Sequence, residues 1–157
     1  MPIGVQRIKM QLTKHTDYAI RVLIYLEKRY IEMQDGKDSL STATDIASVF
    51  NISFNHLTKV VQHLGQAGFI ETVRGKSGGV KLARSAHLIN LGEVVQAMEK
   101  SLDPVNCAEP PCRLRSACLV KPILDKAMNA FIEELKKYTL ADICIEENND
   151  VWQLKLS

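Results

Sequence analysis

The sequence lacks any long apolar run near its start. In the first segment with helical periodicity, the longest uninterrupted apolar stretch covers residues 22–26, whereas a membrane-spanning helix needs about 20 apolar residues. The first seventeen residues carry Arg7, Lys9, Lys14 and Asp17 and contain no apolar region of the kind found in secretion signals. These two absences favour a cytoplasmic protein.

The sequence also lacks the usual signatures of an enzyme. We find no nucleophile with a matching base, no phosphate-binding loop and no pair of carboxylates spaced for acid–base chemistry. The four cysteines form no Cys-x-x-Cys pair, which argues against a thioredoxin-like redox motif. We therefore expect that the protein is not an enzyme.

The composition is that of an ordinary globular domain with unevenly distributed charge. The chain has 157 residues, of which 46% are hydrophobic and 24% are charged, so it can bury a core without disulfide bonds. Residues 1–90 carry a net charge of +5 and residues 91–157 a net charge of −3, which together give the overall +2. A basic first half suits a polyanionic partner, although an uneven solvated surface would give the same numbers.

Two short helices and the turn between them predict a helix-turn-helix, preceded by a helix from Thr13. Ser41 or Thr42 can cap the first of the two, with Asp45 at the spacing of a capping box. Ser53 can cap the second after a tight turn, and in such a unit the second helix enters the major groove of DNA. Taken alone, the pattern fits an ordinary helix pair equally well. The positions expected to face the core are Ala19, Val22, Leu23, Leu26, Tyr30, Ile46, Val49, Phe50, Leu57, Val60, Val61 and Leu64.

Residues 69–84 predict a basic β-hairpin directly after these helices. Val80 and Leu82 alternate along the second strand. Three glycines, at 75, 78 and 79, give the backbone the conformational freedom that a turn requires. Arg74, Lys76, Lys81 and Arg84 place positive charge on and beside the turn. A hairpin in this position is a wing that contacts phosphates or the minor groove. The expected fold class is therefore mainly α with a small β-hairpin wing, a winged helix-turn-helix domain.

A long helix is predicted over residues 121–138, after a shorter one over residues 89–100. Its apolar residues repeat at coiled-coil spacing, at Leu124, Met128, Phe131, Leu135 and Tyr138. A small winged domain cannot cover a helix of this length, so we expect it to pair with a second copy in a homodimer. The alternative is that it packs only on its own domain.

Three of the four cysteines lie within twelve residues, in the segment NCAEPPCRLRSAC. Cys107, Cys112 and Cys118 are separated by four and five residues, which fits poorly with the paired ligands of zinc sites. Soft thiolates also bind iron–sulfur clusters, and three cysteines would leave one iron for a different ligand. A cluster held in this way would be labile, which suits a sensor. Cys144 stands apart on an apolar segment and is expected to be a core residue.

Several features resemble those of the Rrf-type family of winged-helix repressors, and in particular its nitric-oxide-sensing branch. They are the segments MQLTKHTDYAIRVLIYL, NHLTKVVQHLGQAGFIETVRGKSGGVKLA and YTLADI, together with the spacing of the three cysteines. The likeness extends from about Met10 to about Ile143, which is most of the chain.

The resemblance implies a homodimer in which each subunit holds one iron–sulfur cluster on Cys107, Cys112 and Cys118, with 4Fe-4S favoured over 2Fe-2S. It also implies that the fourth ligand is an aspartate of the other subunit, and the matching residue is Asp17. A related branch of the family uses a histidine shortly after the third cysteine, where this chain has Lys121. This departure argues against that branch.

The resulting hypothesis is a repressor that binds an inverted-repeat operator in double-stranded DNA and releases it when nitric oxide attacks the cluster. The alternative is a regulator of the same family that senses iron–sulfur status or oxidants, with zinc or thiols in place of a cluster. An electron-transfer protein is a further alternative, against which the basic wing argues. The expected DNA contacts are Ser53, Asn55, His56, Lys59, Arg74, Lys76 and Ser77.

The expected division of the chain follows from these elements. It consists of a leader (1–9), the winged helix-turn-helix domain (10–90), a linking helix with the cysteine loop (91–119), a dimerisation helix (120–143) and a tail (144–157).

Overall fold

The computed structural model describes residues 11–33 and 40–144. The predicted leader, most of the loop after the first helix and nearly all of the predicted tail lie outside these ranges. None of the helices in the described ranges is long and apolar enough to cross a membrane. In chain order the elements are α1 (Lys14–Glu32), α2 (Ala43–Phe50), α3 (Phe54–Gln66), β1 (Ile70–Val73), β2 (Gly79–Leu82), the 3-10 helix η1 (Ala86–Leu88), α4 (Leu91–Met98), α5 (Val120–Leu135) and α6 (Leu140–Ile143).

Side-chain caps start both helices of the helix-turn-helix where the sequence predicts them. Thr42 Oγ1 accepts a hydrogen bond from the backbone N–H of Asp45 at 3.1 Å, and Asp45 Oδ2 accepts one from the backbone N–H of Thr42 at 3.4 Å. Ser53 Oγ accepts from the backbone N–H of His56 at 3.4 Å. Between the helices, Asn51 adopts a left-handed conformation with φ of 52°, which asparagine tolerates better than most residues. The predicted tight turn is confirmed.

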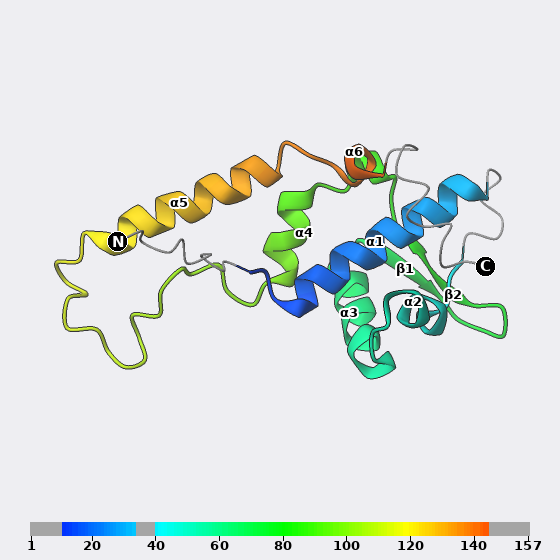
Figure 1. Ribbon diagram of the computed structural model, residues 1–157, viewed down its shortest axis with the longest axis horizontal. Coiled ribbons are helices and arrows are strands. Elements are labelled where there is room, and N and C mark those ends of the chain that lie inside the picture. Colours follow the sequence, from blue (N-terminus) through cyan, green and yellow to red (C-terminus); the bar gives the residue numbers. More distant parts are fainter. Residues whose placement is uncertain (1–10, 34–39, 145–157) are drawn as a thin grey trace, which may run out of the picture.

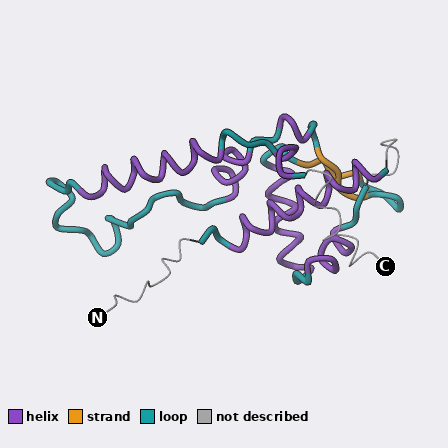
Figure 2. Tube along the Cα trace, turned by 45° about the horizontal axis from the view of Figure 1, so that its top comes forward, coloured by secondary structure: helices purple, strands orange, loops and turns teal. Residues whose placement is uncertain are grey.

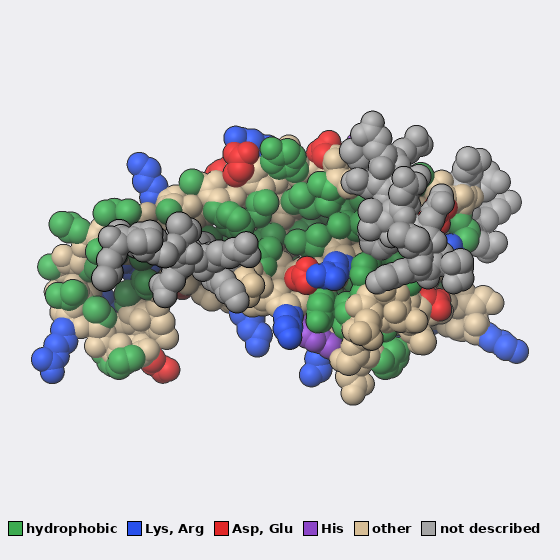
Figure 3. Space-filling model, in the orientation of Figure 1, with side chains coloured by type: hydrophobic (Ala, Val, Ile, Leu, Met, Phe, Trp, Pro, Cys, Tyr) green, Lys and Arg blue, Asp and Glu red, His purple; other side chains and the backbone are tan. Residues whose placement is uncertain are grey.

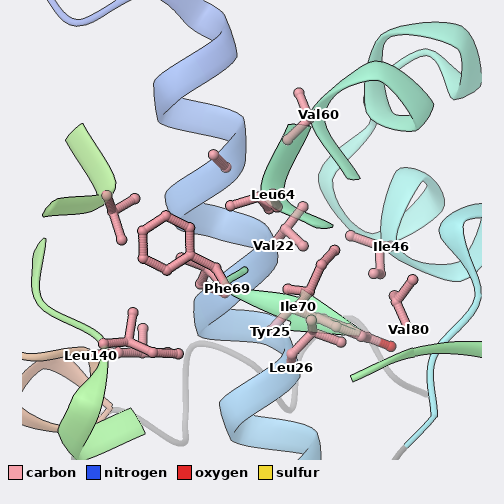
Figure 4. Packing of buried hydrophobic residues seen from close by; sticks show 14 of the residues in the cluster. Val22, Tyr25, Leu26, Ile46, Val60, Leu64, Phe69, Ile70, Val80 and Leu140 are labelled. Carbon is pink, nitrogen blue, oxygen red and sulfur yellow. The ribbon is translucent and has the colours of Figure 1, made fainter. Parts of the chain in front are cut away.

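The core forms around α1, whose apolar stripe contacts α3, α4, α6 and β2. Figure 4 shows Val22 of α1 close to Leu64 of α3 and Leu26 further along α1, with side chains of the hairpin and α6 around them. The predicted inward positions of α2 and α3 are buried or pack against this core. The elements of the candidate DNA-binding surface are thus all supported by α1. Helix α3 and strand β2 contact it directly, while α2 packs on α3 and β1 pairs with β2.

The prediction that Tyr30 lies in the core is wrong. Its side chain is 57% exposed, because the last turn of α1 has passed beyond the elements that cover the stripe. Tyr25 is buried instead, and its ring lies edge-on to Phe50 with 6.2 Å between the ring centroids. The buried stripe of α1 therefore ends one turn before the spacing of its apolar residues predicts.

The hairpin is a two-stranded antiparallel sheet that pairs Ile70 with Leu82 and Val73 with Gly79. A contact that the sequence did not predict anchors its second strand. Ser41 and Val80 exchange backbone hydrogen bonds of 3.0 and 2.8 Å, so the segment leading into α2 adds one bridge to the sheet. A Cβ on Gly79 would lie 2.8 Å from the carbonyl oxygen of Ser41, and glycine therefore permits this close approach.

Helix α5 extends away from the helix-turn-helix and the hairpin, and the cysteine loop lies at its far end (Figures 1 and 2). Its C-terminal half packs against α4, and Ile132 is its one buried side chain. The helix ends at Leu135 and not at the predicted residue 138. Asn90 Nδ2 donates to the carbonyl of Lys136 at 2.6 Å, and the N–H of Leu91 donates to the carbonyl of Tyr138 at 3.0 Å. These bonds hold the chain in a turn after the helix.

The close contact between α4 and α5 depends on Gly92. A Cβ at this position would lie 2.5 Å from Lys136 Cγ and 3.0 Å from the carbonyl oxygen of Ile132. We expect Gly92→Ala to lower the free energy of unfolding by about 1–3 kcal/mol, as overpacked sites do. Thermal or urea unfolding at a fixed protein concentration measures this change.

Gly65→Ala in α3 is the matched control for this substitution. A Cβ at residue 65 meets nothing within 4 Å, so alanine in place of glycine within a helix should leave stability unchanged or raise it by up to about 1 kcal/mol. Equal effects of the two substitutions would contradict the role given to Gly92.

Candidate functional site

The polar residues predicted to read DNA lie on α3 as expected for a recognition helix. Asn55 and Lys59 are exposed on its first two turns, while Leu57 and Val60 of the same turns are fully buried. Ser53 is exposed as well, and its hydroxyl oxygen caps the helix. The N-terminus of a helix carries partial positive charge and free N–H groups, which favour a phosphate nearby. This end of α3 is therefore suited to contact a nucleic acid.

His56, the remaining predicted contact on α3, is only half-exposed because its ring packs on α1. The ring lies edge-on to Tyr18, with 4.8 Å between the centroids, and 6.4 Å from the ring of His15. His56 can therefore present one edge of its ring to a ligand, while the opposite side is held by the protein.

A second histidine of α3 makes a direct polar contact with α1. His15 Nε2 lies 2.9 Å from His63 Nδ1, within hydrogen-bond distance. Burial, and then the charges of His63 and His56, lower the pKa of His15. The seven-residue spacing of His56 and His63 places both on one face of α3, and that signal was present in the sequence. Nothing in the sequence indicated that His15 meets them.

The tip of the hairpin is basic and exposed. Arg74, Lys76 and Ser77 are all exposed, and Gly75 between them has φ of 117°, which a residue with a side chain rarely adopts. At the base of the hairpin, Lys81 pairs with Glu71 at 3.6 Å. Arg84 lies 3.9 Å from Glu93 and stacks over the ring of Phe69. Of the four basic residues predicted for the wing, Lys81 and Arg84 thus pair with carboxylates, while Arg74 and Lys76 are exposed at the tip.

The cysteine loop joins α4 to α5 and carries all three clustered thiols. Cys112 is exposed and Cys107 and Cys118 are half-buried, and all of them are free thiols. The side chain of Asn106 accepts from the backbone N–H of Ala108 at 2.9 Å, and the N–H of Cys112 donates to the carbonyl of Cys107 at 3.1 Å. These bonds turn the loop back on itself between its first two cysteines.

The donor chemistry of this loop fits an iron–sulfur cluster. Beside Cys107 lies a hollow of about 600 Å³, which Arg115 and Lys121 also line. The positive charge of Arg115 would offset the negative charges of thiolates and sulfides, whereas Lys121 is paired with Asp103, which also lines the hollow, at 3.9 Å. Lys121 pairs with Asp125 at 2.8 Å, and this hydrogen bond raises the pKa of its ammonium. In the described part of this single chain, no three His, Cys, Asp or Glu side chains are grouped closely enough to hold a metal ion.

Asp17, the predicted fourth ligand, lies on the first turn of α1 and forms a two-pronged ion pair with Arg21. The Nη2–Oδ2 distance is 2.9 Å and the Nε–Oδ1 distance is 3.1 Å. Both side chains are about half-exposed, so the pair contributes only about 0.3–0.5 kcal/mol to stability.

Cys144 is a core residue, as expected. Its side chain is 5% exposed, and burial followed by the nearby Glu27 raises the pKa of the thiol to about 11. The thiolate is the form that reacts and binds metals, so this environment separates Cys144 chemically from the cysteine loop.

Comparisons with known proteins agree on one family. A family model described as Rrf2, iron-dependent transcriptional regulator, matches residues 12–146. The HTH-type transcriptional regulator NsrR of Halalkalibacterium halodurans is 41% identical over 150 residues, which cover 94% of this chain and 99% of the relative.

Solved structures show the same architecture. CymR (YrzC), the global cysteine regulator of B. subtilis, aligns with a TM-score of 0.62 at 25% identity and covers 87% of this chain and 97% of its own. IscR of T. potens aligns with a TM-score of 0.66 at 22% identity, and the alignment covers 94% of this chain and 93% of the IscR chain. The predicted winged helix-turn-helix fold is confirmed by these matches.

Thiol labelling tests the chemical separation of the four cysteines. Iodoacetamide at pH 8, applied to reduced and metal-free protein, should modify Cys107, Cys112 and Cys118 and leave Cys144 unmodified. A pKa of about 11 leaves only about one part in a thousand of the Cys144 thiol ionised at this pH. Peptide mass spectrometry identifies the labelled sites, with urea-unfolded protein as the control in which all four react. Labelling of Cys144 at the rate of the loop cysteines would contradict this assignment.

Proposed function

Because the chain belongs to the Rrf2 family of transcriptional regulators, we propose that it is a homodimeric repressor whose DNA binding depends on an iron–sulfur cluster and is relieved by nitric oxide. The observation that carries the proposal is the loop with three free thiols, at Cys107, Cys112 and Cys118, on a chain that is 41% identical to a protein named NsrR. The basic first half of the chain and the exposed polar end of α3 support the DNA-binding part.

The DNA-reading surface consists of α3 and the tip of the hairpin. Asn55, Lys59 and the exposed edge of His56 contact base edges and phosphates in the major groove, and Ser53 binds a phosphate at the helix N-terminus. Arg74, Lys76 and Ser77 contact the backbone or the minor groove alongside. A two-fold dimer presents two such surfaces, so its operator is an inverted repeat with half-sites about one helical turn apart.

Helix α5 provides the dimer interface. Leu124, Met128 and Leu135 are only partly covered within one chain, and Ile123 and Phe131 are 66% and 38% exposed. Figure 3 shows hydrophobic side chains at the surface along the length of this helix. Apolar surface of this extent on a projecting helix indicates a protein partner, and a second copy of α5 offers the same apolar spacing.

The ligands of the cluster are the three loop cysteines and the partner subunit's Asp17. When bound, a 4Fe-4S cluster would supply an iron that reacts with nitric oxide and whose oxygen ligand is displaced more readily than its thiolates. Ligation requires Asp17 to give up part of its pairing with Arg21, and a surface ion pair of this kind is weak enough to allow it. When Asp17 is released from the cluster, its carboxylate can pair again with the guanidinium of Arg21. The ion pair thus stabilises the state without cross-subunit ligation.

Cys112→Ala tests this proposal. We expect the purified variant to be colourless and to bind operator DNA about 10³-fold more weakly, near the level of non-specific binding, while remaining a folded dimer. Anaerobic absorbance, gel filtration and DNA retention at one salt concentration measure these properties. Cys144→Ala is the matched control, since it removes the one thiol outside the loop and should keep the chromophore.

Two outcomes would overturn the proposal. Regulated operator binding that is unchanged in Cys112→Ala would show that the loop thiols do not act as ligands of a regulatory centre. A wild-type protein that contains zinc, or only free thiols, and still binds its operator would favour the alternative regulator that senses oxidants or iron–sulfur status.

A further inference from the structure

We infer that Glu99 and the His15–His63 contact connect the cysteine loop to the recognition helix within one subunit. This inference rests on the proposed function, since it names the residues that carry its regulation. The connection runs through the start of α1, a helix that contacts both α4 and α3. Figure 1 shows the start of α1 next to both helices.

The first link is the hydrogen bonding of Glu99, at the end of α4, to the N-terminus of α1. Glu99 follows the last residue of α4 and begins the segment that leads to the cysteines. Its Oε1 accepts hydrogen bonds from the backbone N–H of Thr13 at 2.8 Å and from Thr13 Oγ1 at 3.1 Å. A carboxylate at the N-terminus of a helix also interacts favourably with the helix dipole. The start of the segment that leads from α4 to the cysteines is therefore hydrogen-bonded to the N-terminus of α1.

The second link joins the same turn of α1 to α3. His15 lies two residues after Thr13, and its Nε2 is 2.9 Å from His63 Nδ1. About two turns nearer the N-terminus of α3, the ring of His56 packs against Tyr18. Two contacts of different kinds therefore hold the recognition helix to the first two turns of the helix that Glu99 caps. Figure 3 shows a histidine at the surface beside basic side chains in this region.

These links make Glu99 and His63 positioning residues. Neither side chain belongs to the predicted ligand set or to the predicted DNA contacts. A helical turn transmits a small displacement as a rigid unit, because its backbone hydrogen bonds and caps hold it together. A rearrangement of the cysteine loop that shifts Glu99 would therefore shift the hydrogen-bonding partner of His63. The arrangement acts in addition to a ligand donated across the dimer.

The test compares operator affinity with and without the cluster. The ratio of the two dissociation constants is measured for wild type, Glu99→Ala, His63→Ala and the double variant. The ratio is the dissociation constant of the cluster-free protein divided by that of the cluster-loaded protein. If Glu99 and His63 act in series, each single variant lowers this ratio by about fivefold or more. The double variant then lowers it no further than either single variant. Glu99→Gln keeps an oxygen that can accept from Thr13 and should restore most of the ratio. Glu32→Ala, at the other end of α1, is the control.

A second readout uses the cluster-free protein alone. Glu99→Ala should shift the NMR signals of the His63 ring, because the substitution alters the turn that carries His15. Glu32→Ala should leave these signals in place. This experiment tests the connection without reference to the loaded protein or to DNA.

The outcomes separate the connection from the proposed function. Three results would overturn the connection and leave the proposed function standing. They are equal losses of operator affinity in the cluster-loaded and cluster-free forms, additive effects in the double variant, and His63 signals that do not shift. A wild-type ratio of one would overturn the proposed function, and with it the regulatory role of Glu99 and His63.

Discussion

The burial of one face of α1 is the constraint on which the rest of the structure depends. Ala19, Val22, Leu23 and Leu26 lie in the centre of the core, and α3, α4, α6 and β2 all pack around this helix. The same helix carries Asp17 and His15 on its first turns, outside the buried stripe. The element that organises the core therefore also carries the candidate ligand Asp17 and packs against the recognition helix α3.

Local signals predicted much of the fold, and contacts between distant segments account for most of what was missed. The caps at Thr42 and Ser53 follow from short-range sequence patterns, because a cap and its target lie within one helical turn. The burial of Tyr25 and the exposure of Tyr30 could not be predicted in this way, since they depend on where neighbouring helices stop covering α1. The bridge between Ser41 and Val80 likewise depends on tertiary packing.

The candidate site was predicted unevenly for the same reason. Residue type and spacing are enough to single out the cysteine loop and the basic tip of the wing. The meeting of His15 with His63 joins residues 48 positions apart, and the cap of Glu99 on Thr13 joins residues 86 apart. No pattern in one sequence links such pairs. These long-range contacts place Glu99, at the end of α4, and His63 of the recognition helix against the start of one helix, α1.

The most direct test of the account is an anaerobic titration of the purified protein with nitric oxide, in which visible absorbance and operator retention are followed in the same samples. The account predicts a coloured protein that holds its operator, a chromophore that bleaches as nitric oxide is added, and release of DNA in proportion to the bleaching. A colourless protein that binds the operator equally well before and after nitric oxide would contradict it.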